Sequence, residues 1–213
     1  MKIRKELPSL ALIAMPLIYL GIIWQKLPEE VPIHWNALGE IDGYGSKFTL
    51  LLLPILMPGL TYLTFALIQR FTAIEQVAKM GKKLNTLKFL IVLFMSVLCM
   101  LIIHSSKEGL VGQPTFVFVS LGLLFTVFGN FFRTIQPNYF LGIRTPWTLK
   151  SAIVWKSTHE FAGKLWFVGG LIIALIALLS SSRIASFSII GIVILITLVP
   201  LIYSYLESKK QTK

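Results

Sequence analysis

Residues 184–205 read IASFSIIGIVILITLVPLIYSY and contain no charged side chain. A helix rises about 1.5 Å per residue, so about 20 apolar residues are needed to cross a hydrocarbon core of about 30 Å. This stretch therefore predicts a transmembrane helix, and similar runs recur along the chain. The six predicted spans are residues 7–24, 48–69, 87–103, 115–132, 161–179 and 184–205.

The composition favours the same class of protein. Hydrophobic residues make up 55% of the 213 residues and charged residues only 14%, whereas an average soluble domain carries roughly 25% charged residues. The mean hydropathy is +0.79. A water-soluble fold cannot bury this much apolar surface, so we predict an all-α, polytopic membrane protein with six transmembrane helices.

The positions of the basic residues predict how the chain is oriented. Sixteen of the twenty Lys and Arg residues lie at the N-terminus, in residues 70–88 and 133–164, and in the C-terminal tail. Because cytoplasmic loops carry an excess of Lys and Arg, both termini are predicted to lie in the cytoplasm. The net charge of +11 is thereby explained by topology, and we predict no direct binding of nucleic acid.

Two long loops occupy matching places in the two halves of the chain. Residues 25–47 are predicted to form an external loop, and residues 133–160 a cytoplasmic one. Each follows the first span of a three-span half, and we divide the chain into halves 1–104 and 105–213. The matching positions hint at an inverted repeat, although the two loop sequences barely align.

The external loop mixes prolines, glycines, aromatic residues and acids. Prolines disfavour a regular helix and glycines permit tight turns, so we expect a compact cap. His34, Asn36, Glu40 and Asp42 lie close together in this loop. Their spacing matches no strong metal signature, and local hydrogen bonding is the expected arrangement. We predict no metal here, and binding of one by His34 or Asp42 remains open.

The cytoplasmic loop contains a pattern typical of an amphipathic helix over residues 148–163. Thr148 or Ser151 would cap this helix, and one face would be apolar at the three-and-four spacing. The residues of that face are Val154, Trp155, Thr158 and Ala162. We expect this helix to lie in the membrane interface, with Lys150 and Lys156 toward the headgroups.

Catalytic chemistry has little support in this sequence. His159 and Glu160 are adjacent and could form an acid–base pair, but no metalloprotease, phosphate-loop or serine-elbow motif occurs. We therefore predict no enzyme and no cofactor. Arg144 could bind an anion or a protein carboxylate, or it could pair with Glu160 or cap a helix.

At the two loops the sequence resembles the SdpI family of bacterial membrane immunity proteins. Residues 27–47, LPEEVPIHWNALGEIDGYGSK, resemble the family's N-terminal domain of unknown function. Residues 138–163, NYFLGIRTPWTLKSAIVWKSTHEFAG, resemble its C-terminal signature. The order of these blocks, the chain length and the hydrophobic pattern agree, so the resemblance covers most of the chain.

The resemblance implies a multi-pass protein of the bacterial cytoplasmic membrane that protects a Gram-positive cell against a secreted, membrane-active toxin peptide. In the best-known members it also implies signalling, in which the toxin-engaged protein holds a cytoplasmic transcriptional repressor at the membrane. The expected external recognition residues are His34, Trp35, Asn36, Gly39, Asp42 and Tyr44. The expected cytoplasmic signature and partner surface comprises Asn138, Tyr139, Gly142, Arg144, Thr145, Pro146, Trp147, Trp155 and His159.

Two other classes of function stay open. A transporter of a small molecule or lipid is favoured by the possible repeat and by Pro54 and Pro58, which predict a kink in the second span that could serve as a hinge. A membrane enzyme would use His159 with Glu160, or an external metal at His34. Flux into proteoliposomes would identify the first class, and loss of turnover on substitution of either histidine the second.

Overall fold

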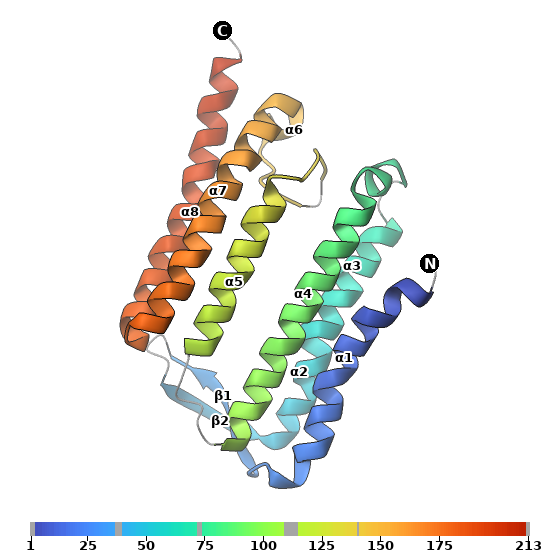
Figure 1. The fold of residues 1–213 in the computed structure, drawn as a ribbon, viewed down its shortest axis with the longest axis vertical. Helices are drawn as coiled ribbons and strands as arrows, with labels where there is room; N and C mark the ends of the chain where they lie inside the picture. The colour runs from blue at the N-terminus through green and yellow to red at the C-terminus, as the bar shows by residue number, and fades with distance from the viewer. Residues whose placement is uncertain (1–2, 37–39, 72–73, 109–114, 140, 212–213) are drawn as a thin grey trace. The chain divides into compact units, whose positions relative to one another are not determined.

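The computed structural model describes residues 3–36, 40–71, 74–108, 115–139 and 141–211 (Figure 1). Within these ranges six helical segments are long and apolar enough to cross a membrane, which confirms the predicted all-α polytopic fold. They are Glu6–Lys26, Lys47–Arg70, Lys83–Lys107, Thr115–Phe132, Ala152–Leu179 and Ser182–Lys210.

The chain divides into two compact units. The N-terminal unit comprises Met1–Ala73 and Gly81–Val117, and the C-terminal unit comprises Ile74–Met80 and Phe118–Lys213.

The N-terminal unit contains α1 (Ile3–Ile23), most of α4 (Ile74–Glu108) and a β-hairpin. A short 3₁₀ turn (Trp24–Lys26) leads from α1 into the hairpin, whose antiparallel strands are β1 (Glu30–Trp35) and β2 (Ile41–Ser46). The predicted compact cap is thus a β-hairpin, and the sequence did not predict these strands.

An apolar cluster fixes the hairpin to the helices of its unit. Val31, in β1, has no exposed surface, and Leu27, just before the strand, is 5% exposed. Both belong to a buried cluster with residues of α1 and α4. The members of this cluster are Leu20, Ile23, Leu27, Val31, Leu50, Cys99 and Ile103. The hairpin is therefore packed against the helices of its unit and does not extend freely from them.

The second span changes from one kind of helix to another along its length. A 3₁₀ turn (Lys47–Leu51) is followed by α2 (Leu52–Pro54), a π-helical turn (Ile55–Gly59) and α3 (Leu60–Phe71). Proline has no N–H to donate, so Pro58 cannot continue the α-helical ladder. The wider π turn lets the next N–H groups find acceptors, and Leu60 N–H donates to Ile55 O. The predicted kink is thus a π turn.

The C-terminal unit contains most of α5 (Thr115–Phe132), the short α6 (Pro146–Lys150), α7 (Ala152–Leu179) and α8 (Ser182–Lys210). The helices α7 and α8 are antiparallel neighbours joined by Ser180 and Ser181 (Figure 1). Trp166 Nε1 donates to Ile196 O at 2.8 Å, which satisfies the indole N–H inside this pair.

Glycines bring α5 and α7 into backbone contact. A Cβ added at Gly122 would lie 2.6 Å from Gly170 O, and one added at Gly129 would lie 2.2 Å from Phe167 N. These neighbours are backbone atoms that cannot rotate away. Small residues at such positions allow the close packing on which helix association in lipid depends.

The expected interfacial helix over residues 148–163 is not a separate element. From Ala152 onward these residues form the first turns of α7, so the fifth span begins nine residues before the predicted residue 161. Ser151 caps α7 and accepts from Val154 N, as predicted. The predicted apolar face is buried within the unit, so it packs against protein and not against lipid headgroups.

We expect Gly129→Ala to lower the free energy of unfolding by about 1–3 kcal/mol, the usual cost of overpacking. Thermal unfolding of the purified protein in detergent measures this change. Gly191→Ala in α8 is the matched control, because nothing lies within 4 Å of a Cβ there. Equal unfolding midpoints for the two variants would contradict the role assigned to Gly129.

Candidate functional site

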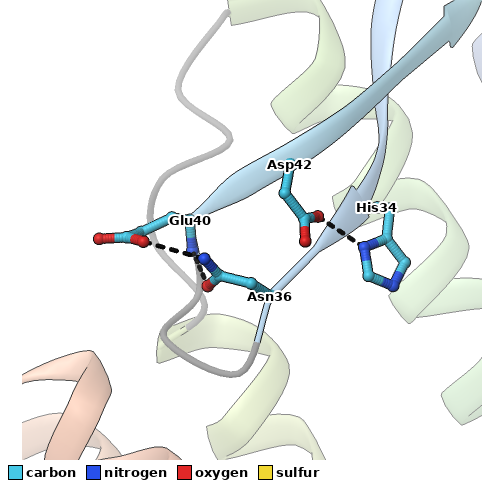
Figure 2. Close-up of polar contacts among 4 residues, drawn as sticks. All are labelled: His34, Asn36, Glu40 and Asp42. Carbon is cyan, nitrogen blue, oxygen red and sulfur yellow. Dashed lines mark hydrogen bonds and ion pairs between the residues drawn. The ribbon is translucent and has the colours of Figure 1, made fainter.

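The hairpin of the N-terminal unit carries two polar pairs, drawn in Figure 2. His34 Nδ1 lies 2.5 Å from Asp42 Oδ1, across the two strands. Asn36 Nδ2 donates to Glu40 Oε2 at 2.9 Å, and Glu40 N–H donates to Asn36 Oδ1 at 3.0 Å. The predicted local hydrogen bonding among these four residues is therefore confirmed.

These side chains are accessible to a partner. The His34 and Asp42 side chains are 70% and 42% exposed. Two apolar residues of the same strands, Ile33 and Tyr44, are 50% and 60% exposed. Among the described residues, no group of three or more His, Cys, Asp or Glu side chains could hold a metal ion. The hairpin thus carries exposed apolar groups as well as exposed hydrogen-bonding groups.

The structure describes two of the predicted external residues incompletely or not at all. Trp35 forms the end of β1, but its side chain lies outside the described residues, and Gly39 lies outside them altogether.

His159 is the centre of the cytoplasmic signature in the C-terminal unit. Its side chain, near the start of α7, is 1% exposed. Ile143 N–H donates to His159 Nε2 at 2.9 Å, and His159 Nδ1 lies 2.8 Å from Trp155 O. A carbonyl can only accept, so Nδ1 carries the proton and the imidazole is neutral. His159 therefore fixes the loop backbone to α7, and neither nitrogen is free for acid–base chemistry.

Trp155 completes this buried contact. Its ring stacks on His159 with a centroid distance of 4.1 Å, and its Nε1 donates to Ile135 O at 2.9 Å. Both residues thus connect α7 to the segment that follows α5.

Asn138 and Gly142 shape the loop itself. Asn138 Oδ1 accepts from Leu141 N–H at 2.8 Å, and its Nδ2 donates to Gln136 O at 2.8 Å. Gly142 has a φ of 101°, which strongly favours glycine, and a Cβ there would lie 2.3 Å from His159 Nε2. The backbone approaches the imidazole closely because this residue has no side chain.

Thr145, Pro146 and Trp147 begin the short helix α6. Thr145 and Thr148 form a reciprocal capping box, and Pro146 occupies the first turn, where its lack of an N–H costs nothing. Trp147 Nε1 donates to Ser204 Oγ at 2.7 Å, which joins α6 to α8.

Only part of the signature faces outward. Arg144 is exposed, and its Nη1 donates to Tyr139 O at 2.6 Å. The Tyr139 side chain is itself 61% exposed. Glu160, considered as a partner of Arg144, instead lies 3.9 Å from Lys156. Tyr139, Arg144 and Pro146 are therefore the exposed residues of the signature.

A buried ion pair in the N-terminal unit was missed by the sequence analysis. Lys88 Nζ in α4 lies 2.7 Å from Glu6 Oε2 in α1, and the two side chains are only 4% and 8% exposed. Tyr62 of α3 donates to the same carboxylate at 3.0 Å. Opposite charges at the ends of two predicted spans were the available signal, since an intramembrane charge needs a partner.

His104 also has a partner that the sequence did not suggest. Its Nδ1 lies 2.6 Å from the hydroxyl of Tyr19, which connects α4 to α1.

We expect Glu6→Gln to destabilise the protein by about 3–5 kcal/mol, because Lys88 is left buried without its counter-charge. Unfolding in detergent provides the measurement. Glu207→Gln removes the partner of Lys210, which is 69% exposed, and should leave the unfolding midpoint nearly unchanged because water screens an exposed pair. The double variant Glu6→Gln/Lys88→Met should recover most of the loss. No recovery would show that the pair's charges are not the cause.

Both regions are similar to known protein families. Residues 134–204 match the model of the SdpI/YfhL protein family, and residues 11–57 match a domain of unknown function, DUF1648. The first match contains the His159 loop with α7 and most of α8, and the second contains the hairpin.

The similarity to one relative extends along almost the whole chain. The chain is 29% identical over 205 residues to the immunity protein SdpI of Bacillus subtilis, covering 96% of this chain and 94% of the relative. It is also 41% identical over 76 residues to an uncharacterized protein of Archaeoglobus fulgidus, covering 32% of this chain and 42% of that protein. No solved structure matches the chain. The chain thus has six helical segments able to span a membrane, is similar to the SdpI/YfhL protein family over residues 134–204, and is similar to an immunity protein of Bacillus subtilis over almost its whole length.

Proposed function

We propose that this protein is an immunity protein of the cell membrane that protects against a secreted, membrane-active toxin peptide. The observation that carries the proposal is the 29% identity to an immunity protein across 96% of the chain. That alignment spans polar loops as well as apolar helices, so it reflects more than a shared hydrophobic composition. The backbone bonds of both His159 nitrogens favour a non-enzymatic role for this residue.

The hairpin is the proposed site of toxin recognition. It follows the first span and belongs to the side with few basic residues, where a secreted peptide arrives. A membrane-active peptide has apolar groups, which the exposed Ile33 and Tyr44 can contact. The His34–Asp42 pair supplies hydrogen-bonding groups beside them. Anchoring of Val31 in the apolar cluster holds these groups in place and lowers the entropic cost of binding.

The loop around Arg144 is the proposed surface for a cytoplasmic transcriptional repressor. Arg144 and Tyr139 offer a guanidinium and a phenol on an exposed segment. Arginine and tyrosine are enriched among residues that dominate protein interfaces. The buried His159 and Trp155 hold that segment against α7 and would keep the surface preformed.

We expect Tyr44→Ala to abolish most protection of a toxin-sensitive bacterium challenged with a purified Sdp-type toxin. Loss of an interface hot spot costs about 2 kcal/mol or more, or about thirtyfold in binding. The tolerated toxin concentration should fall by a similar factor at matched membrane abundance. Arg183→Gln, an exposed change in the first turn of α8, is the control.

Two outcomes would contradict the proposal. If Tyr44→Ala, His34→Ala and Asp42→Asn all protect the cell as well as the parent does, the hairpin is not the site of toxin recognition. No protection by the correctly inserted parent would argue against immunity to this toxin.

We expect Arg144→Ala to separate signalling from immunity. A fluorescent fusion of an SdpI-family autorepressor should move to the membrane when toxin engages the parent protein. It should stay in the cytoplasm with Arg144→Ala, whereas survival of the cells should be retained. Lys150→Ala, an exposed change in α6, is the matched control. Membrane recruitment by Arg144→Ala at the parent's level would overturn this assignment.

A further inference from the structure

A cavity of about 300 Å³ lies between the C-terminal end of α5 and the middle turns of α7. It is lined by Asn130, Arg133, Gly163, Lys164, Phe167 and Val168. A second cavity of about 250 Å³ shares Arg133 and also includes Lys156 and Glu160 in its lining. Ligand pockets span roughly 300–1,000 Å³, so the first cavity has room for a small polar headgroup.

The lining of the first cavity is positively charged. Arg133 and Lys164 are both exposed, and no carboxylate of the described residues forms an ion pair with either. Glu160, the acid of the second cavity, forms an ion pair with Lys156 at 3.9 Å. Two cations that have no carboxylate partner among the described residues therefore line the same cavity.

The backbone of α7 leaves space for the arginine. A Cβ at Gly163 would lie 2.5 Å from Arg133 Cγ, so the aliphatic stem of Arg133 passes directly over this glycine. The stem is thus laid across α7, and Arg133 contributes to both cavities. An arginine held in this way can present its planar fork to an oxyanion.

The side of the cavity away from the loop is apolar and open. Phe167 and Val168 line the cavity and are 41% and 52% exposed. Leu171 and Leu175, on the following turns of α7, are 45% and 56% exposed. In a membrane-spanning helix such residues face acyl chains. The cations lie near the predicted cytoplasmic boundary, where anionic headgroups gather.

We propose that Arg133 and Lys164 bind the phosphate of an anionic glycerophospholipid, with its acyl chains along Phe167 and Val168. The chemistry shared with any phosphate ligand is an oxyanion between a guanidinium and an ammonium. The adjoining apolar residues Phe167 and Val168 favour a lipid over a free phosphate, because only a lipid has acyl chains that can cover them. The site is independent of the hairpin and of the proposed immunity function.

The test uses the purified full chain in a neutral detergent, with bound lipid counted by native mass spectrometry. Phosphatidylglycerol, phosphatidylcholine and glycerol 3-phosphate are titrated separately. We expect phosphatidylglycerol to bind most tightly, and its affinity to fall about fivefold in Arg133→Gln or Lys164→Gln and about 25-fold in the double variant. Lys150→Gln, an exposed lysine of the same unit outside both cavities, should change it less than twofold.

Four results would overturn the proposal. Equal binding of phosphatidylglycerol and phosphatidylcholine would show no preference for an anionic lipid. An equal loss in Lys150→Gln would indicate diffuse surface charge instead of a site. Displacement of phosphatidylglycerol by glycerol 3-phosphate at equal concentration would identify a free-phosphate site. Since Lys164 is exposed, Lys164→Gln should fold, and unchanged binding by this variant alone would also contradict the assignment.

Discussion

The interior of a membrane offers the backbone no water to bond with, so every segment that crosses it must satisfy its own N–H and C=O groups. That constraint explains why the six apolar runs are helical and why the strands lie in a loop between spans. It also explains the π turn at Pro58. The missing proline N–H breaks the regular ladder, and the wider turn gives the following groups new acceptors.

Helices in lipid gain little from the hydrophobic effect when they meet, so other contacts must hold them together. In the C-terminal unit, α5 and α7 approach to backbone distance through Gly122 and Gly129. In the N-terminal unit, Glu6, Tyr62 and Lys88 join three helices through one carboxylate. These contacts hold the helices of each unit together.

The two loops use their polar residues in opposite ways. In the hairpin, His34 and Asp42 are paired with each other and remain exposed. In the signature loop, His159, Trp155 and Thr148 are buried and bond to backbone atoms. A motif of this second kind specifies a loop conformation, and its exposed members are left to contact partners.

The number of spans, their approximate positions and the predicted orientation followed from the sequence by itself, because length, hydropathy and charge act locally and add along the chain. The capping by Ser151 and the bonds among His34, Asn36, Glu40 and Asp42 were also within its reach, since those partners are close in sequence. The tertiary structure alone decided the pairing of Glu6 with Lys88 and of Tyr19 with His104. It also decided that the predicted interfacial helix is the start of α7, because the loop after α5 covers its apolar face through Trp155 and His159. Such contacts join residues far apart in the chain, and no local pattern encodes which of many apolar faces will meet.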